Sequence, residues 1–273
     1  MMKVPKSVIG SIAIVIALAS QAAAGGLPDV LGIQLGMPAR EAHAKLQGQF
    51  PKNNLQVMST NLPSIEKPVI SSFQSAPKQT LAMGDEADIV TVDVTLPPNK
   101  QAAWRVGRNH FFPGKGIPKT TMLASLREKY GKETRAMIGS KPTIDESKIT
   151  NLLWLMDEQG RPATPPPLLG MVDPLTSCKT TAEGNGALLV ESPLPIIQVN
   201  PDYTWCLSNY TAVTVEFMQG ELPELYSRMQ VGIVSLPFAA RAGEATMKWK
   251  KEVAEGQHKQ ELEKAKQQEK PKL

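Results

Sequence analysis

Histidine, cysteine and aromatic side chains are scarce in this chain. Its 273 residues include three histidines and two cysteines, and 5% of them are aromatic. The zinc-protease pattern His-Glu-x-x-His, the hydrolase pattern Gly-x-Ser-x-Gly and the phosphate-binding pattern Gly-x-x-x-x-Gly-Lys followed by Ser or Thr are all absent. The common enzymes that carry these signatures are therefore excluded. The sequence predicts no catalytic residue, no cofactor and no metal site.

The apolar run near the N-terminus is too short to cross a membrane. It spans Val8–Ala19, whereas a membrane span takes about 20 residues. Lys3 and Lys6 precede it and Ala22-Ala23-Ala24 follows it, which is the order of an export signal. We therefore predict a signal peptide over 1–24 and a periplasmic or secreted mature protein. No cysteine lies near the cut, so a lipid anchor is not expected.

Net charge and proline content narrow the class of protein further. The formal charge is +4, and it falls to +2 once Lys3 and Lys6 are removed with the signal. A balance this slight does not indicate nucleic-acid binding. The 23 prolines indicate many loops around a modest sheet rather than a helical bundle.

A short phrase occurs twice, 80 residues apart, and it is the main guide to the fold. In both copies a Gly-x-Pro start is followed by three apolar residues spaced four apart: Gly36, Pro38, Ala42, Leu46 and Phe50, and then Gly116, Pro118, Met122, Leu126 and Tyr130. Proline suits the first turn of a helix, and the spacing places the apolar side chains on one helical face. Each phrase therefore predicts an amphipathic helix, the second of which ends at Gly131.

Alternating residues predict the strands that these helices cover. Val90–Leu96 alternates apolar residues with Thr and Asp, and Val213–Phe217 repeats the pattern with Thr and Glu. The two segments are 123 residues apart rather than 80, so the second copy contains about 43 additional residues. Shorter strands are expected within Pro68–Phe73, Leu152–Met156 and Met229–Leu236.

The sequence thus predicts an α+β fold of two tandem repeats, each with one helix followed by antiparallel strands. The first repeat spans 25–100, the second spans 101–240, and a charged helical or disordered tail spans 241–273. The additional residues form an insertion at about 160–203, which is rich in proline and glycine. Long insertions often have a binding role.

The two cysteines lie in or just beyond the second half of this insertion. In an oxidising compartment an even count favours pairing, so we predict a disulfide between Cys178 and Cys206 that staples the insertion. The alternatives are a two-thiol metal site or a redox pair. A bridge that closes a loop of this length contributes about 3–4 kcal/mol in the chain-entropy model.

The first phrase resembles a known family. Ile33-Gln34-Leu35-Gly36-Met37-Pro38, followed by Glu41, Ala42 and Leu46, is similar to the opening of the small outer-membrane protein A family. The β-lactamase inhibitor protein has a related architecture, with a helix-and-strands unit in tandem. The family commonly has Thr or Ser where this chain has Pro38, and the insertion has no counterpart. The resemblance implies a binding module of the export compartment rather than an enzyme.

One segment combines the residue types that anchor binding surfaces. Just before the second repeat lie Trp104, Arg105, Arg108, His110 and Lys115, and arginine and aromatic residues are frequent anchors at interfaces. The alternative is a strand and turn that packs Trp104 on the core and leaves the charges in water.

The sequence therefore predicts an exported, non-catalytic binding or assembly module of the cell envelope. Its partner would be another envelope or secreted protein, or a small anionic ligand, and nucleic acid is not expected. The alternative is a secreted hydrolase of an unrecognised class.

Overall fold

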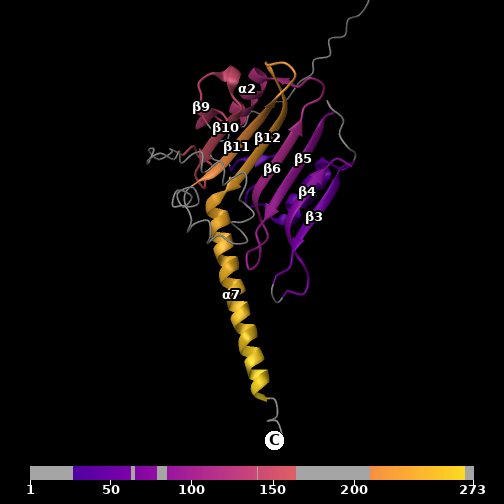
Figure 1. Cartoon of the computed structure of the whole chain (residues 1–273), viewed down its shortest axis with the longest axis vertical. Helices are drawn as coiled ribbons and strands as arrows, with labels where there is room; N and C mark the ends of the chain where they lie inside the picture. Colours follow the sequence, from indigo (N-terminus) through magenta and orange to yellow (C-terminus); the bar gives the residue numbers. More distant parts are fainter. Residues whose placement is uncertain (1–26, 63–64, 79–84, 140, 164–209, 268–273) are drawn as a thin grey trace, which may run out of the picture.

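The computed structural model describes residues 27–62, 65–78, 85–139, 141–163 and 210–267. Within them the chain has an α+β fold, in which three α-helices pack on one large antiparallel sheet (Figure 1). The predicted signal peptide, both cysteines and most of the predicted insertion lie outside these residues, as does the predicted disulfide.

Within the described residues the sheet has ten strands, and strands from both predicted repeats belong to it. Nine of them lie side by side in the order β3 (Asn54–Thr60), β4 (Val69–Ala76), β5 (Ala87–Val94), β6 (Ala103–Phe111), β12 (Leu225–Ser235), β11 (Thr211–Gln219), β10 (Asn151–Met156), β8 (Arg135–Ile138) and β9 (Lys141–Pro142). The short β7 (Ile117–Pro118) pairs with the beginning of β12. Because β5 pairs with β6 across the predicted boundary at residue 100, both predicted repeats contribute to this single sheet.

The strands expected from alternation are confirmed as β4, β5, β10, β11 and β12, with somewhat different ends. The sequence did not predict β3, because five of its seven residues are exposed and no apolar alternation marks it. It also did not predict β8, which has four residues.

The two predicted helices form α1 (Ala39–Gln49) and α2 (Lys119–Tyr130). The apolar stripes are confirmed, because Ala42 and Leu46 are buried in α1 and Met122 and Leu126 in α2. Gly131 ends α2 as predicted, with its N–H donating to the carbonyl of Arg127 at 2.9 Å.

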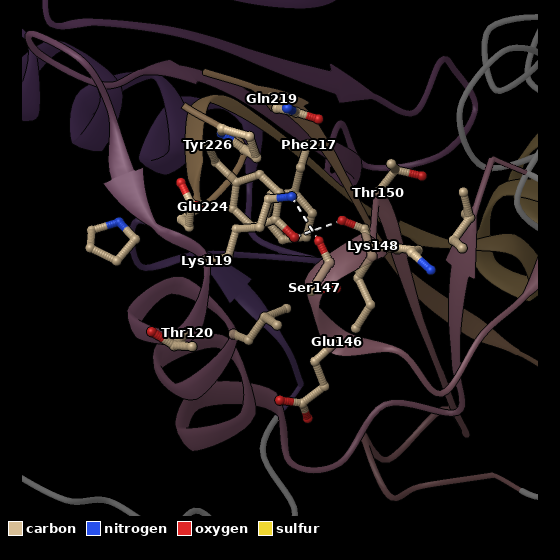
Figure 2. A pocket seen from close by; sticks show the side chains of 15 residues that line it. Lys119, Thr120, Glu146, Ser147, Lys148, Thr150, Phe217, Gln219, Glu224 and Tyr226 are labelled. Atoms are coloured by element: carbon tan, nitrogen blue, oxygen red, sulfur yellow. Dashed lines mark hydrogen bonds between the residues drawn. The ribbon is translucent and has the colours of Figure 1, made fainter. Parts of the chain in front are cut away.

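Glycine is required where the chain enters each helix. Gly36 and Gly116 have φ of 81° and 107°, in the left-handed region that other residues rarely adopt. A Cβ on Gly116 would lie 2.2 Å from the carbonyl oxygen of Tyr226. The first side chain of α2, Lys119, is close by and points toward the backbone of Ser147 (Figure 2).

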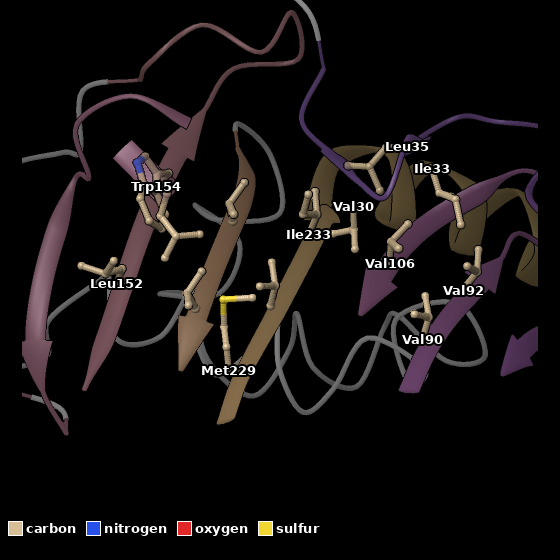
Figure 3. Close-up of a cluster of buried hydrophobic side chains, with 14 of the residues drawn as sticks. Val30, Ile33, Leu35, Val90, Val92, Val106, Leu152, Trp154, Met229 and Ile233 are labelled. Atoms are coloured by element: carbon tan, nitrogen blue, oxygen red, sulfur yellow. The ribbon is translucent and has the colours of Figure 1, made fainter. Parts of the chain in front are cut away.

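The main core lies between the sheet and the layer that contains α1 and α2. Side chains from β5, β6, β10 and β12 point to this side, among them Val92, Val106, Trp154 and Ile233 (Figure 3). The hairpin of β1 (Asp29–Val30) and β2 (Ile33–Gln34) covers the middle of the same face. Its Val30 and Ile33 are buried in this cluster.

Among the described residues, the opposite face of the sheet is covered at one end only. There the start of α7 (Leu236–Gln267) buries Leu236 and Ala239 against Trp104 and Leu155. The helix then projects well beyond the sheet (Figure 1), and at 32 residues it is about 48 Å long. Among the described residues, no helix is both long and apolar enough to span a membrane.

Candidate binding groove on the sheet

Four of the five residues predicted to bind lie on β6, and they point to both faces of the sheet. Successive side chains of a strand alternate in direction, so Arg105 lies on the opposite face from Arg108 and His110. An irregularity between Asp93 and Val94 on β5 shifts the register with β6. Trp104 therefore packs in the core under α7, on the other face from Val106. With 1% of its surface exposed, Trp104 presents almost no area to a partner.

Arg108 and His110 form a cluster with an acidic residue on the next strand. Nη2 of Arg108 donates to Oδ2 of Asp88 at 3.1 Å, and Nδ1 of His110 lies 3.0 Å from Oδ1 of the same carboxylate. Burial alone would raise the pKa of Asp88, but the hydrogen bonds from His110 and Arg108 outweigh it and hold the pKa below its ordinary value. The His110 ring also packs edge-on against Phe112.

Arg105 forms an ion pair with a different acidic residue of β5. Its Nη1 lies 3.3 Å from Oδ2 of Asp93, which is directly opposite it in the sheet. Here burial raises the pKa of Asp93 above its ordinary value, and the charge of Arg105 offsets this only in part. Lys115 lies apart from both pairs, exposed in the turn after β6. The five predicted residues therefore do not form one surface.

A groove lies instead at the centre of the uncovered sheet face. Gly107 of β6 is directly opposite Gly232 of β12, so neither of the two central strands has a side chain there. The groove has a volume of about 200 Å³. Glycine inside a strand often marks a place where another backbone approaches closely.

Neutral hydrogen-bonding side chains line this groove, and Arg105 is the predicted site residue whose side chain faces it. The lining includes Gln74, Thr91, Asn109, Thr214 and Gln230. Amides and hydroxyls both donate and accept hydrogen bonds, which suits recognition of a polypeptide backbone or of polar side chains.

One flank of the groove is held in place by Arg228. Its Nε donates to the side-chain oxygen of Asn109, and its guanidinium lies 5.1 Å from the centre of the Phe111 ring. Sequence reasoning missed Arg228, and it missed the facing pair Gly107 and Gly232. The available signal was a glycine inside each of two segments that otherwise alternate as strands.

A larger cleft lies at the start of α2 and has a volume of about 840 Å³ (Figure 2). Lys119 is buried beside it, and its ammonium donates to the carbonyl of Ser147 at 2.8 Å and lies 5.2 Å from the centre of the Tyr226 ring. Among the described residues no carboxylate lies within ion-pair distance of this ammonium. The helix start also lacks a side-chain cap and an acidic residue in its first turn.

In the part of the chain that the structure describes, no three His, Cys, Asp or Glu side chains gather closely enough to hold a metal ion. The hydrogen bonds of His110 within that part go to Asp88 and Arg108.

Comparison with known proteins finds no matching family model, no similar curated protein and no similar solved structure.

Proposed function

We propose that the protein is an exported, non-catalytic binding module that holds another protein of the cell envelope against the uncovered face of its sheet. The observation that carries the proposal is the groove over Gly107 and Gly232. Within the described part of the chain nothing covers it, and neutral hydrogen-bonding side chains line it together with Arg105. A rigid scaffold of this kind binds a partner without reorganising, which lowers the entropic cost of association. Export follows from the composition of residues 1–24.

The proposed architecture behind this surface is a tandem repeat, as in the family that the first phrase resembles. The chain order supports it: α1 is followed by β3, β4, β5 and β6, and α2 by β8, β10, β11 and β12, with the two-residue β9 between β8 and β10. This division places β6 in the first unit, although the predicted boundary at residue 100 assigned it to the second. Each set of four strands is laid down in order from the outer part of the sheet toward its centre.

Strand register supports the repeat more sharply. Phe73 pairs with Val92 in the first half, and Leu152 pairs with Val215 in the second. Leu152 follows Phe73 by 79 residues, and Val215 follows Val92 by 123 residues. In the same way Val90 pairs with Arg108, and Val213 pairs with Ile233. Val213 follows Val90 by 123 residues, and Ile233 follows Arg108 by 125 residues. The same offset of 125 relates Gly107 to Gly232.

The groove would then lie on the axis that relates the two repeats. The paired residues across the groove are, in order, Thr91, Gly107, Gly232 and Thr214. The order of residue types is therefore the same from either side of the groove. Different neighbouring side chains, among them Gln74 and Arg105, distinguish the two sides, so the groove can favour one orientation of its partner.

The test is to fill the groove without unfolding the sheet. A Cβ on Gly107 meets only the carbonyl oxygen of Val231, at an ordinary 3.9 Å, so Gly107→Val fits the strand and places its side chain in the groove. The control, Gly48→Ala, adds a side chain in open space on α1. The partner captured by the mature protein from envelope extract is identified and purified, and its affinity for all three proteins is measured.

We expect Gly107→Val to weaken binding at least about tenfold and Gly48→Ala to leave it unchanged. Equal binding by Gly107→Val would refute the groove as the site. Cleavage of the partner by the purified wild-type protein would favour the hydrolase alternative.

A small anion is the second candidate partner, and the buried Lys119 favours it. Within the described residues this ammonium has no carboxylate at ion-pair distance and lies next to an uncapped helix start, which favours an anion. Glu146 and Glu224 also line the cleft, so the anion would have to bind on the Lys119 side. The probes are acetate and inorganic phosphate, followed by amide chemical shifts of α2. Saturable shifts at Lys119 that disappear in Lys119→Met but persist in Lys148→Met, a change at the exposed rim, would support this site. Shifts that are unchanged in Lys119→Met would exclude it.

A further inference from the structure

The two edges of the sheet differ in how they are protected from pairing with another strand. At one edge lies β9, which has only the two residues Lys141 and Pro142. A short strand, a lysine and a proline that lacks an N–H are all devices that block edge-to-edge association.

The edge at β3 has almost none of these devices. Its seven residues, Asn54–Thr60, include no charge and no proline, and no strand among the described residues pairs with its outer side. Val57 and Met58 are 47% and 43% exposed. An irregularity follows Met58 in the pairing with β4, which leaves Asn54–Met58 as a regular run. An exposed, uncharged edge of this kind is a template for an additional strand.

The row of side chains on the core side stops abruptly at this edge. Val92 on β5 and Phe73 on β4 are buried, and the next residue in that row is Val57 on β3. Leu55, which points the same way, is only partly buried against the core. A further strand with apolar residues on this side would cover both.

We infer that β3 pairs in antiparallel orientation with β3 of a second copy of this chain, with the twofold axis at Gln56. In this register Leu55 of each copy lies opposite the partner's Val57, so the apolar residues on the core side cover one another. The two Gln56 amides face each other across the axis and can exchange hydrogen bonds.

The strand is its own complement in this arrangement, which is why a second copy is the favoured occupant. No like charges meet across the axis, and the irregularity after Met58 lies outside the paired run. The contact is one short strand pair, well below the size of a standard interface. The dimer should therefore be weak and dependent on concentration, and it should join two sheets into one through a surface separate from the groove.

The experiment is sedimentation equilibrium of the mature chain from low micromolar to submillimolar concentration. The informative variant is Gln56→Lys, because like charges directly opposite each other destabilise a strand pair. Gln47→Lys, on the exposed surface of α1, adds the same charge away from the edge. We expect wild type and Gln47→Lys to dimerise alike, and Gln56→Lys to dimerise at least about tenfold more weakly.

Gln56→Cys provides a second readout that does not depend on dimer strength. Its thiols lie on the axis, so mild oxidation should link two chains through this residue, whereas Gln47→Cys should not link. Sedimentation as a monomer throughout with no linkage of Gln56→Cys would overturn the inference. So would a dimer that Gln56→Lys leaves intact, or a β3 edge that captures the strand of a different protein while the chain itself stays monomeric.

Discussion

Truncation of Leu46 and Leu126 should destabilise the protein strongly and to a similar extent. Leu46 is completely buried and Leu126 is 6% exposed, and both belong to the same core cluster. Leu→Ala removes the buried side chain beyond Cβ and leaves a cavity, which together cost about 2–5 kcal/mol. Because both residues occupy the same place on their helices, the two losses should agree within about 1 kcal/mol.

The neighbouring residues provide matched controls for this experiment. Lys45 and Ser125 each precede one of the leucines and are exposed. Lys45 donates one hydrogen bond to the carbonyl of Gly32, and the Ser125 hydroxyl donates to the carbonyl of Thr121 in its own helix. Substitution of either by Ala should change the free energy of unfolding by no more than about 0.5–1 kcal/mol.

The assay is urea denaturation of the four single variants, with the m-value compared with that of wild type. If Leu46→Ala and Leu126→Ala prove as mild as Lys45→Ala, the two helices do not hold the core and the packing described above is wrong. If only one leucine matters, the helices are not equivalent and the proposed repeat fails.

Three further predictions test the electrostatics, the backbone and the insertion. Because the pKa of Asp88 is lowered in the folded protein, its carboxylate stabilises the fold above about pH 4, and this stabilisation is lost as the pH falls through the folded pKa. Because the pKa of Asp93 is raised, ionisation of its carboxyl group lowers the stability of the fold as the pH rises. From about pH 3 to pH 7, Asp88→Asn should therefore lose stability relative to wild type and Asp93→Asn should gain it in urea titrations; the reverse order would contradict these shifts. Gly116→Ala should lower stability by more than about 2 kcal/mol, whereas Gly48→Ala in exposed helix should be neutral or stabilising; equal thermal melting of the two variants would contradict the close approach at Tyr226. Non-reducing peptide mapping should yield one peptide pair linked through Cys178 and Cys206, and two free thiols would refute that sequence-based prediction.

Local periodicity in the sequence accounts for α1, α2 and most of the central strands, whereas α7 begins at Leu236, inside a segment predicted to be a strand. The four-residue spacing of Ala42, Leu46 and their counterparts in α2 marks the faces that the structure buries. The alternation at Val90 and Val213 marks strands with one face on the main core. These patterns arise because burial repeats with the period of the element itself.

The candidate groove could not be predicted in the same way, because it depends on pairing between distant segments. Nothing near Arg108 in the sequence indicates that Asp88 lies across from it on the next strand. The irregularity at Asp93 that turns Trp104 to the other face leaves no mark in the residue pattern. The groove is defined by side chains that are missing from two strands 125 residues apart, and only strand register brings them together.

If a partner protein binds over Gly107 and Gly232, hydrogen–deuterium exchange of the complex should locate it there. Exchange is measured on the mature protein alone and on the mature protein saturated with its captured partner. We expect added protection in the peptides that cover β6 and β12 around these glycines, with the helices α1 and α2 on the far face unchanged. Added protection on α1 and α2, with none in β6 and β12, would contradict it.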